Sequence, residues 1–366
     1  MKQVLIRPTF QDWCNNRLFT HGTDWQGLYR DAFSGWKEKA AGLGIKIDTW
    51  DQSPLETCDL LWLLDLPPSK TEFEKIRSRL RPGTPIVLQV LESPAIAPFG
   101  LIPANRTEAA AILTYEHLDS IPDAGKCFHY HLPMPVLWPA KNPPFSERKG
   151  FLMLCTNRVS GLWAIRQPGL AGLPFFGRML AGWKCPLSLV MELLRGDLYA
   201  ERRAVAREAV THMPDFLDVF GHGWSGEQIS WCPLYPNRPY PSWRGDPKIS
   251  KHELCAEYRF VIAYENFRGR RGYVSEKIFD AYQAGSVPVY LGDERIAEFV
   301  PPDSFVDARD FHTHRELLAY LKSRTEPEWL EMRESGQKFL RSESFQPFSD
   351  EVFAERAMEI LKRILM

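Results

Sequence analysis

The chain has 366 residues, with 45 Lys and Arg against 46 Asp and Glu, and 44% of its residues are hydrophobic. This length exceeds what one hydrophobic core usually organises, so two domains are expected. The balanced charge excludes a bulk electrostatic field for nucleic acid or an anionic membrane, and any basic ligand site must therefore be local.

The first half of the chain alternates strand and helix patterns. Strands are predicted at Val4–Arg7, Ile45–Trp50, Asp59–Asp65 and Pro85–Leu91, and helices at Trp25–Ala41 and Thr71–Leu80. This alternation is typical of parallel strands with helices on both faces of one sheet. Residues 1–145 are therefore expected to form an N-terminal α/β domain.

A proline-rich stretch separates this half from a second α/β pattern. Residues 132–146 contain five prolines, which remove amide donors and stiffen the chain, as suits an interdomain linker. Beyond it, strands are predicted at Phe151–Cys155, Phe216–Phe220, Arg259–Tyr264 and Val287–Leu291, and helices at Tyr199–His212, Glu276–Ala284 and Asp350–Leu365. We expect a second α/β domain over residues 146–348 and a C-terminal helix over 349–366 that crosses back to the first domain. In such folds, ligands bind beyond the carboxyl ends of the strands.

Residues 259–311 hold the most informative local pattern. An apolar strand ends at residues 264–266, a basic loop follows, and Ser275 stands as the N-cap of a helix with Glu276 and Lys277 in its first turn. The arginines of the loop are Arg268, Arg270 and Arg271. A helix start suits a diphosphate, Lys277 adds a full positive charge, and a carboxylate such as Glu276 can accept hydrogen bonds from both ribose hydroxyls. The pattern also fits ordinary helix capping with solvated surface charges.

Four segments occur in order within this stretch. They are Tyr264-Glu265-Asn266, Tyr273-Val274-Ser275-Glu276-Lys277, Ala284-Gly285-Ser286-Val287-Pro288-Val289 and Pro302-Asp303-Ser304-Phe305. The ordered set resembles the signature of the α-1,3/4-fucosyltransferases, glycosyltransferase family ten, in a bacterial-type soluble member. The resemblance implies two Rossmann-like domains that face a cleft, the arrangement called GT-B. It also implies that Asn266, Tyr273, Glu276 and Lys277 hold GDP-fucose, with Glu276 on the ribose and Lys277 on the phosphates.

Glu92 is the candidate catalytic base. Inverting glycosyl transfer needs a group that takes the proton from the attacking acceptor hydroxyl. Glu92 follows a buried strand, and Pro94 prevents that strand from simply continuing. On local pattern alone, a glutamate in this place is an ordinary surface residue. Leu91-Glu92-Ser93-Pro94, followed by Leu113-Thr114-Tyr115 and Asp119-Ser120, resembles the family's acceptor-side motif. This resemblance implies that Glu92 is the base.

Two departures from the family pattern concern the donor site. Many members carry an arginine near the phosphates after a glycine that matches Gly221, whereas this chain has His222. Either His222 donates a weaker, pH-dependent hydrogen bond to the phosphates, or a neighbouring arginine replaces the missing one, with Arg158, Arg270 and Arg271 as the candidates. Residue 267 is Phe where Ser is usual, while Ser275 replaces a commoner Thr and keeps the capping hydroxyl. A GDP-sugar stays the expected donor, and the choice between fucose and another deoxysugar stays open.

The chain contains no D-x-D triplet, which metal-dependent transferases commonly use to hold a nucleotide diphosphate. We therefore expect no cofactor and no essential divalent metal, with Lys, Arg and helix amides neutralising the diphosphate. The seven cysteines form no C-x-x-C pair, which argues against a zinc site or a disulfide frame and favours a cytoplasmic protein. The N-terminus lacks the long apolar run of a signal peptide or membrane anchor.

Residues 161–196 resemble an insertion relative to typical members. The stretch is apolar but is broken by Pro168, Pro174 and Pro186, so it is a poor membrane span. Two interpretations stay open. The segment either packs on its own domain or forms an interfacial patch that brings the protein to a lipid-linked acceptor at the inner face of the membrane.

The resemblance implies an inverting enzyme that moves fucose from GDP-fucose to a hydroxyl of a GlcNAc-containing oligosaccharide or glycolipid, in α-1,3 or α-1,4 linkage. No nucleic-acid partner is expected. One alternative keeps the fold and Glu92 but uses another GDP-deoxysugar. The other is a catalytically silent glycan-binding protein, and the presence of both Glu92 and Lys277 argues against it.

Overall fold

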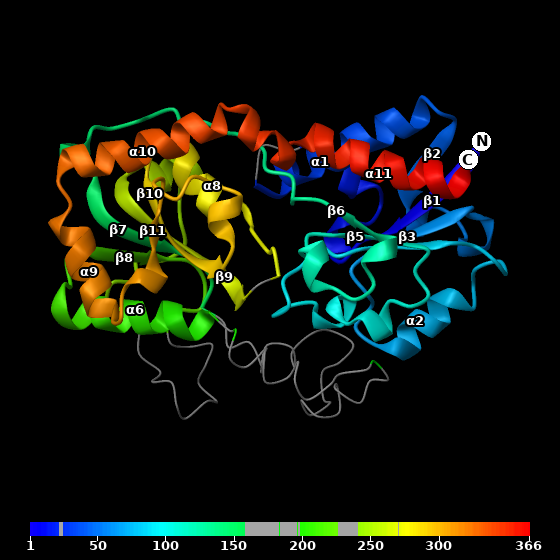
Figure 1. The fold of residues 1–366 in the computed structure, drawn as a ribbon, viewed down its shortest axis with the longest axis horizontal. Coiled ribbons are helices and arrows are strands. Elements are labelled where there is room, and N and C mark those ends of the chain that lie inside the picture. The colour runs from blue at the N-terminus through cyan, green and yellow to red at the C-terminus, as the bar shows by residue number, and fades with distance from the viewer. Residues whose placement is uncertain (22–24, 158–182, 184–195, 197, 226–240, 270) are drawn as a thin grey trace.

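The structure is a computed structural model, and it describes the chain except for residues 22–24, 158–182, 184–195, 197, 226–240 and 270. Two parallel β-sheets, each accompanied by helices, form two α/β domains that lie side by side (Figure 1). The expected fold class, two Rossmann-like domains facing each other, is confirmed. The domain limits at residues 145 and 348 stay a prediction.

The sheet of the first domain has the strand order β2-β1-β3-β4-β5-β6, and all neighbouring strands are parallel. Its strands are β1 (Lys2–Arg7), β2 (Ile45–Thr49), β3 (Leu60–Leu64), β4 (Ile86–Gln89), β5 (Ala111–Thr114) and β6 (Cys127–His129), and its helices are α1 (Trp25–Ala41) and α2 (Lys70–Arg77). Every residue of β3, LLWLL, is buried, as expected where elements cover both faces of a parallel sheet. This burial explains why β3 has a continuous apolar run rather than an alternating pattern.

The sheet of the second domain has the order β11-β10-β9-β7-β8, again with parallel neighbours. Its strands are β7 (Lys149–Leu154), β8 (Leu217–Phe220), β9 (Tyr258–Gly269), β10 (Val287–Asp293) and β11 (Val306–Asp307). Its helices are α6 (Tyr199–His212), α7 (Lys251–Ala256), α8 (Glu276–Gln283), α9 (His314–Ser323) and α10 (Glu326–Leu340). Helix α8 connects β9 to β10, so its N-terminus lies at the carboxyl edge of the sheet.

Strand β9 corrects one sequence prediction. The apolar pattern predicted that the strand would end at residues 264–266, but β9 continues to Gly269. The extension follows from pairing, because Gly269 aligns with Asp293 of β10 after a register shift. As a result Glu265 lies within the sheet and is fully buried, rather than at the start of a loop.

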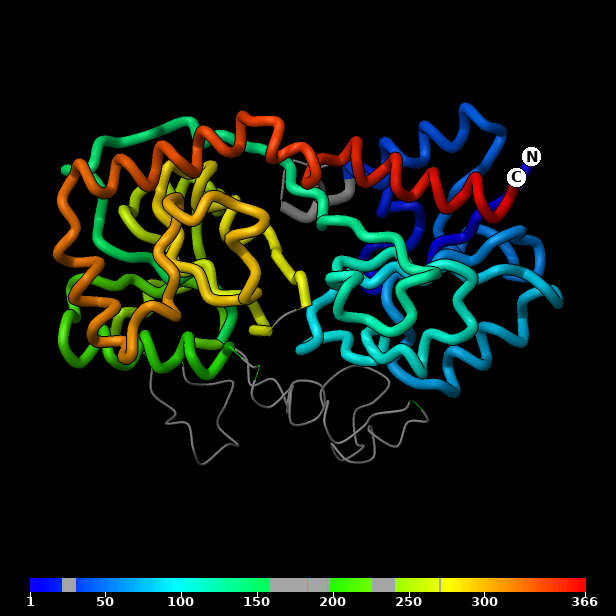
Figure 2. The backbone as a smooth tube through the Cα atoms, in the orientation of Figure 1, coloured from blue at the N-terminus to red at the C-terminus, as the bar shows by residue number. Residues whose placement is uncertain are grey.

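The C-terminal helix α11 (Asp350–Leu365) crosses back to the first domain, as predicted. Figure 2 shows the chain running from α10, over the second domain, into α11, over the first. Helix α11 packs against α1, where the ring of Phe353 lies 5.0 Å from that of Phe33 and 6.3 Å from that of Trp36. Because α11 belongs to the core of the first domain, the two domains are tied together at two points of the chain.

The proline-rich linker supplies the second tie. The side chain of Gln283, at the end of α8, donates to the carbonyl of Pro135 (3.0 Å) and accepts from the amide of Leu137 (2.7 Å). The linker is therefore fixed against the helix that carries the predicted donor residues. Within the described part of the chain, no helix combines the length and apolar character needed to span a membrane.

Candidate active site

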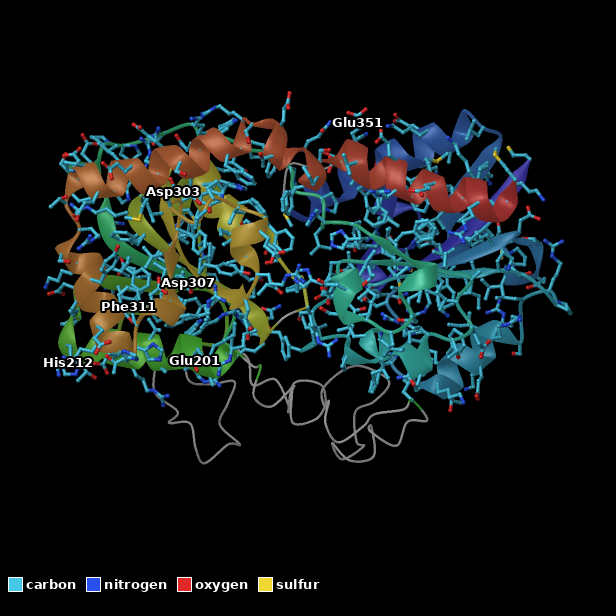
Figure 3. All side chains as sticks on the ribbon, viewed as in Figure 1. Glu201, His212, Asp303, Asp307, Phe311 and Glu351 are labelled. Atoms are coloured by element: carbon cyan, nitrogen blue, oxygen red, sulfur yellow. The ribbon has the colours of Figure 1, made fainter. Side chains whose placement is uncertain are left out.

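The carboxyl ends of the two sheets meet between the domains. Segments that follow β5 in the first domain contact segments that follow β9 and β10 in the second. The contacts are Tyr115 with Tyr273 (5.1 Å between ring centroids), His117 with Asp293 (3.3 Å, Nε2 to Oδ1) and Glu116 with Arg271 (3.3 Å, Oε1 to Nη1). Side chains of both domains extend into the space between the two ribbons (Figure 3). This edge is where ligands of open parallel sheets bind.

Glu92 lies on a turn that leaves β4 towards this edge. The hydroxyl of Tyr115 donates to the carbonyl of Glu92 (2.8 Å), and Asp65 Oδ1 accepts from the amides of Leu91 (2.9 Å) and Glu92 (3.2 Å). The carboxylate itself is partly buried and accepts a long hydrogen bond from the amide of Ser93 (3.3 Å). The backbone of the turn is thus held firmly, whereas the carboxylate has few partners.

The surroundings of Glu92 favour its protonated form. Burial raises the pKa of Glu92 to about 7, and the negative charges of Asp65 and Glu276 add to the increase while Lys277 opposes it. Because Glu276 and Lys277 belong to α8, their effect on Glu92 shows that the predicted base and the start of the donor helix lie close together. A carboxylate with a pKa near neutrality suits general-base catalysis.

Glu265 organises the start of α8. Its fully buried carboxylate accepts hydrogen bonds from the amide (2.8 Å) and hydroxyl (2.6 Å) of Ser275 and from Nζ of Lys277 (3.1 Å). Ser275 stands at the N-cap position as predicted, but its hydroxyl does not cap the helix because it donates to Glu265 instead. The pattern did not single out Glu265, since its role depends on the extended course of β9.

Lys277 and Glu276 form an ionic pair at the helix start. The side chain of Lys277 is 21% exposed and that of Glu276 is 41% exposed. Burial lowers the pKa of Lys277, but the nearby carboxylates of Glu265 and Glu276 outweigh this effect and raise the pKa above its usual value. Burial alone would raise the pKa of Glu276, but Lys277 and Lys251 hold it below its ordinary value. Lys277 is therefore a fixed cation, and Glu276 presents an ionised carboxylate towards solvent.

Arg202 of α6 supports the same region, and the sequence pattern assigned it no role. The side chain of Arg202 is buried, and its Nη2 donates to the carbonyl of Glu265 (2.8 Å) and to Oδ1 of Asn266 (3.1 Å). Its charge also acts on Lys277, where it opposes the increase in pKa. Asn266 is therefore held in place by a second buried cation beside Lys277.

His222 lies at the carboxyl end of β8. It stands between Gly221 and Gly223, which have positive φ angles of 113° and 87°. A Cβ atom on Gly221 would lie 2.6 Å from the carbonyl oxygen of Cys155, so this turn lies tightly against the end of β7. The carbonyl of His222 accepts from the amide of Asn157 (2.8 Å), and its side chain is exposed. His222 thus lies on the same sheet edge as Asn266.

The arginines that were expected near the phosphates are not all described. Arg158 and Arg270 lie outside the described residues. Arg271 forms an ion pair with the buried carboxylate of Glu116, so it contributes to the contact between the domains. Its role towards a phosphate stays a prediction.

Most of the segment 161–196, including the proposed membrane contact, also lies outside the described residues. One of its described residues, Trp183, is buried, and its indole nitrogen donates to the carbonyl of Pro67 (3.0 Å). Its ring also lies 5.5 Å from that of Phe73. At this point the segment packs on the first domain.

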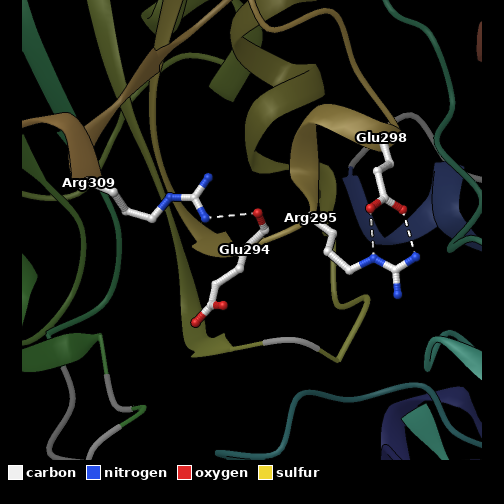
Figure 4. A pocket seen from close by; sticks show the side chains of 4 residues that line it. All are labelled: Glu294, Arg295, Glu298 and Arg309. Atoms are coloured by element: carbon white, nitrogen blue, oxygen red, sulfur yellow. Dashed lines mark hydrogen bonds and ion pairs between the residues drawn. The ribbon is translucent and has the colours of Figure 1, made fainter. Parts of the chain in front are cut away.

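A polar hollow of about 700 Å³ opens beyond the ends of β10 and β11 (Figure 4). The described residues that line it are Glu294, Arg295, Glu298 and Arg309. Arg295 pairs with Glu298 (2.7 Å) and with Asp119 of the first domain (2.9 Å), and Arg309 donates to the carbonyl of Glu294 (2.9 Å). Both arginines are therefore already engaged within the chain, and the hollow gives no particular reason to expect an anionic ligand.

Within the part of the chain that the structure describes, no group of three or more His, Cys, Asp or Glu side chains is arranged to hold a metal ion. Metal independence itself stays a prediction.

Comparison with known proteins connects the second domain to a family. Residues 201–329 match glycosyltransferase family 10 (fucosyltransferase), C-terminal part. An α-(1,4)-fucosyltransferase of Arabidopsis thaliana is 44% identical over 79 residues, which is 21% of this chain and 20% of that protein. An α-(1,3)-fucosyltransferase of Helicobacter pylori is 40% identical over 73 residues, which is 20% of this chain and 15% of that protein. The similarity thus spans a fifth or less of the length of these two relatives.

The overall architecture is shared with a solved structure. A crystal structure of an α1,3-fucosyltransferase with GDP is similar over 99% of this chain and 90% of that chain, with a TM-score of 0.53 and 14% identity. At this identity the similarity establishes the GT-B fold alone. The family match includes Asn266 and the segment 273–277, whereas Glu92 lies outside it.

Proposed function

We propose that this chain belongs to glycosyltransferase family 10 and is an inverting fucosyltransferase that uses GDP-fucose and a GlcNAc-containing oligosaccharide or glycolipid. One observation carries the proposal. Burial raises the pKa of Glu92 in the first domain to about 7, and Glu276 and Lys277 of the second domain lie near enough to influence it. This supports a base from the first domain and a cationic helix start from the second acting at one interdomain site, as transfer from a nucleotide sugar requires.

The second domain would bind the donor. Lys277 and the free amides at the start of α8 would neutralise the diphosphate, because a helix N-terminus carries partial positive charge. The exposed carboxylate of Glu276 would accept hydrogen bonds from the ribose hydroxyls. Asn266, oriented by Arg202, and Tyr273, packed on Tyr115, would complete the donor site. Negative charge that develops on GDP as it leaves would meet cations already in position.

The first domain would supply the base. Glu92 would take the proton of the acceptor hydroxyl while its oxygen attacks the anomeric carbon from the face opposite GDP. The bond between that carbon and the GDP oxygen breaks as the new glycosidic bond forms, so the configuration inverts. Tyr115 and Asp65 keep the turn of Glu92 in place during this step.

The departures from the family pattern affect the donor choice unequally. Phe267 is only 3% exposed, and its ring lies against Gly196, so this substitution is absorbed by packing. His222 remains exposed at the sheet edge and is the observation that favours another GDP-deoxysugar as the second candidate donor. Both candidates share Glu92 and α8.

A glycan array with labelled GDP-fucose, in parallel with other GDP-deoxysugars, tests the proposal. We expect incorporation of fucose into acceptors that contain GlcNAc, detected by mass spectrometry. Incorporation of a different sugar would establish the second donor. If no sugar is incorporated and GDP-fucose is not hydrolysed any faster than by the Glu92→Gln variant, a glycan-binding protein would replace both enzymatic interpretations.

We further propose that transfer needs no divalent metal, since Lys277, Arg202 and helix amides supply positive charge at the donor side. Initial rates in excess EDTA are expected to stay within about twofold of those with Mn²⁺ or Mg²⁺. A loss of activity in EDTA that only added metal restores would contradict this proposal.

A further inference from the structure

Asp65 is a buried carboxylate directly after β3, beside the turn that carries Glu92. It is 2% exposed and has a positive φ of 56°. Residues other than glycine rarely adopt this left-handed conformation, although Asp does so more readily than most. The conformation places the side chain of Asp65 against the exit of the neighbouring strand β4, where it has a set of specific partners.

Both oxygens of Asp65 are used. Oδ1 accepts from two successive amides, those of Leu91 (2.9 Å) and Glu92 (3.2 Å). Oδ2 accepts from the hydroxyl of Thr9 (2.8 Å), which follows β1, and the amide of Asp65 donates to the carbonyl of Gln89 in β4 (2.8 Å). One side chain therefore joins the ends of β1, β3 and β4 and fixes the residue that would act as the base.

We propose that Asp65 is a positioning residue for Glu92, which holds the turn through two backbone amides and keeps a second carboxylate beside the base. The proposal rests on the proposed role of Glu92 as the base. The sequence pattern could not indicate it, because Asp65 and Glu92 are 27 residues apart and meet only through the pairing of β3 with β4.

The second carboxylate has an electrostatic consequence. Burial raises the pKa of Asp65, and the charge of Asp65 in turn helps to raise the pKa of Glu92 to about 7. The titratable groups coupled to Glu92 include Asp65 and Tyr130 in the first domain and Tyr273, Glu276 and Lys277 in the second. Arg7 and Tyr115 are coupled to Asp65, and the hydroxyl of Tyr115 donates to the carbonyl of Glu92. Two nearby carboxylates resist double ionisation, so the second to ionise becomes the stronger base.

The Asp65→Asn substitution removes the negative charge of the side chain but keeps its size and shape. The asparagine oxygen can still accept from the backbone amides, but the negative charge is lost. Glu92 would then lose its proton more easily, so the acid limb of the kcat–pH profile is expected to move to lower pH by about one unit. Because Glu92 becomes a weaker base, kcat on the alkaline plateau is expected to fall roughly threefold to tenfold, with the KM for GDP-fucose within about twofold.

Two further variants separate positioning from general damage. Asp65→Ala removes both the charge and the acceptors, so its kcat is expected to fall further than that of Asp65→Asn, by roughly 10²-fold, at a similar KM. Asp48→Asn is the matched control, because Asp48 is also a buried carboxylate near the end of a first-domain strand, where it pairs with Lys37 and Lys46. It is expected to leave the acid limb unchanged.

A titration that does not depend on activity separates this proposal from the proposed function. In protein with ¹³C-labelled glutamate carboxyls, the signal lost in Glu92→Gln identifies Glu92, and Asp65→Asn is expected to lower its midpoint. An unchanged midpoint in a folded Asp65→Asn protein would overturn the role of Asp65, whatever the activity. A lowered midpoint in a protein without transferase activity would support the positioning role and count against the proposed function alone. If Asp65→Asn does not fold, Asp65→Ser removes the same charge and serves in its place.

Discussion

Glu92 and Glu265 are two carboxylates at facing sheet edges, and they differ in how many hydrogen-bond partners they have. Glu265, in the second domain, accepts hydrogen bonds from the amide and hydroxyl of Ser275 and from Lys277. The Glu92 carboxylate, by contrast, accepts a long hydrogen bond from the amide of its neighbour Ser93, at 3.3 Å. The glutamate carboxylate of the second domain thus has several hydrogen-bond partners, whereas that of the first domain has few.

The difference shows how environment divides the work between the domains. Glu265 has a cation beside it, so it serves as a fixed anion that holds Lys277 and the start of α8 in place. Burial raises the pKa of Glu92, and its anionic neighbours Asp65 and Glu276 add to the increase although Lys277 opposes it. A saturated carboxylate orients other groups, whereas a carboxylate with few partners is free to take a proton.

The largest effect is expected for Glu92→Gln. The amide keeps the size of the side chain but cannot accept a proton, so kcat is expected to fall by roughly 10³-fold. Affinity for GDP, measured by isothermal titration calorimetry, is expected to stay within about twofold because Glu92 belongs to the other domain. Asp48→Asn provides the control for a buried first-domain carboxylate. Retention of more than about a tenth of the wild-type kcat would remove Glu92 from the mechanism.

Glu265→Gln is expected to act on binding rather than on proton transfer. The amide keeps one acceptor oxygen but loses the negative charge opposite Lys277 and the second acceptor, so Lys277 and Ser275 are held less firmly. The Kd for GDP is therefore expected to rise roughly tenfold to a hundredfold. Breaking a buried ion pair typically costs about 3–5 kcal/mol of stability, and the lower end applies because Lys277 is 21% exposed.

The pH profile distinguishes Glu265→Gln from variants near the base. Its acid limb is expected to stay close to that of the wild type, because burial, Asp65 and Glu276 are the causes that raise the pKa of Glu92. If Glu265→Gln instead shifted the acid limb and left the Kd for GDP unchanged, the proposed division between the two carboxylates would be wrong.

The sequence predicted three of the long helices closely, but it did not predict α9 and α10, which have ten and fifteen residues. Helices α1, α6 and α11 have the predicted bounds, because their apolar residues recur over fourteen residues or more. Strands β5 and β6 were not predicted, since four and three residues are too few to establish a period. The full length of β9 was also missed, because its end depends on pairing with Asp293 rather than on its own composition.

The candidate site was predicted in part. Motif resemblance indicated Glu92, Tyr273, Glu276 and Lys277, and the structure brings these residues together across the domain boundary. The supporting residues Asp65, Arg202 and Glu265 were assigned no role, although Glu265 stands within a motif segment, because each acts through contacts made only in the folded chain. The sequence therefore indicated the residues that would contact a ligand, but not the residues that hold those side chains in position.

The smallest expected effect concerns stability, and it has the opposite sign for the two carboxylates. The pKa of Glu92 in the folded protein, about 7, lies above its ordinary value of 4.5, so folding disfavours the ionised form. This cost is absent below about pH 4.5, grows as the pH rises towards 7 and is constant above it. Glu92→Gln removes the cost, so at pH 8 the variant is expected to be more stable than the wild type by on the order of 1–2 kcal/mol, discounted for partial exposure.

Thermal unfolding of Glu92→Gln at pH 8 and at pH 4.5 checks this sign. The variant and the wild type are expected to differ by a few degrees in Tm at pH 8, roughly 2–4 °C per kcal/mol or somewhat less for a chain of this size, and to converge at pH 4.5. Glu265→Gln is expected to be less stable than the wild type, because it loses the ion pair with Lys277. A Glu92→Gln protein less stable than the wild type at pH 8 would mean that Glu92 has stabilising partners of its own. The difference between a reactive and a structural carboxylate would then have to be sought elsewhere. A gain would instead show that the first domain gives up stability to keep its base reactive, as active sites commonly do.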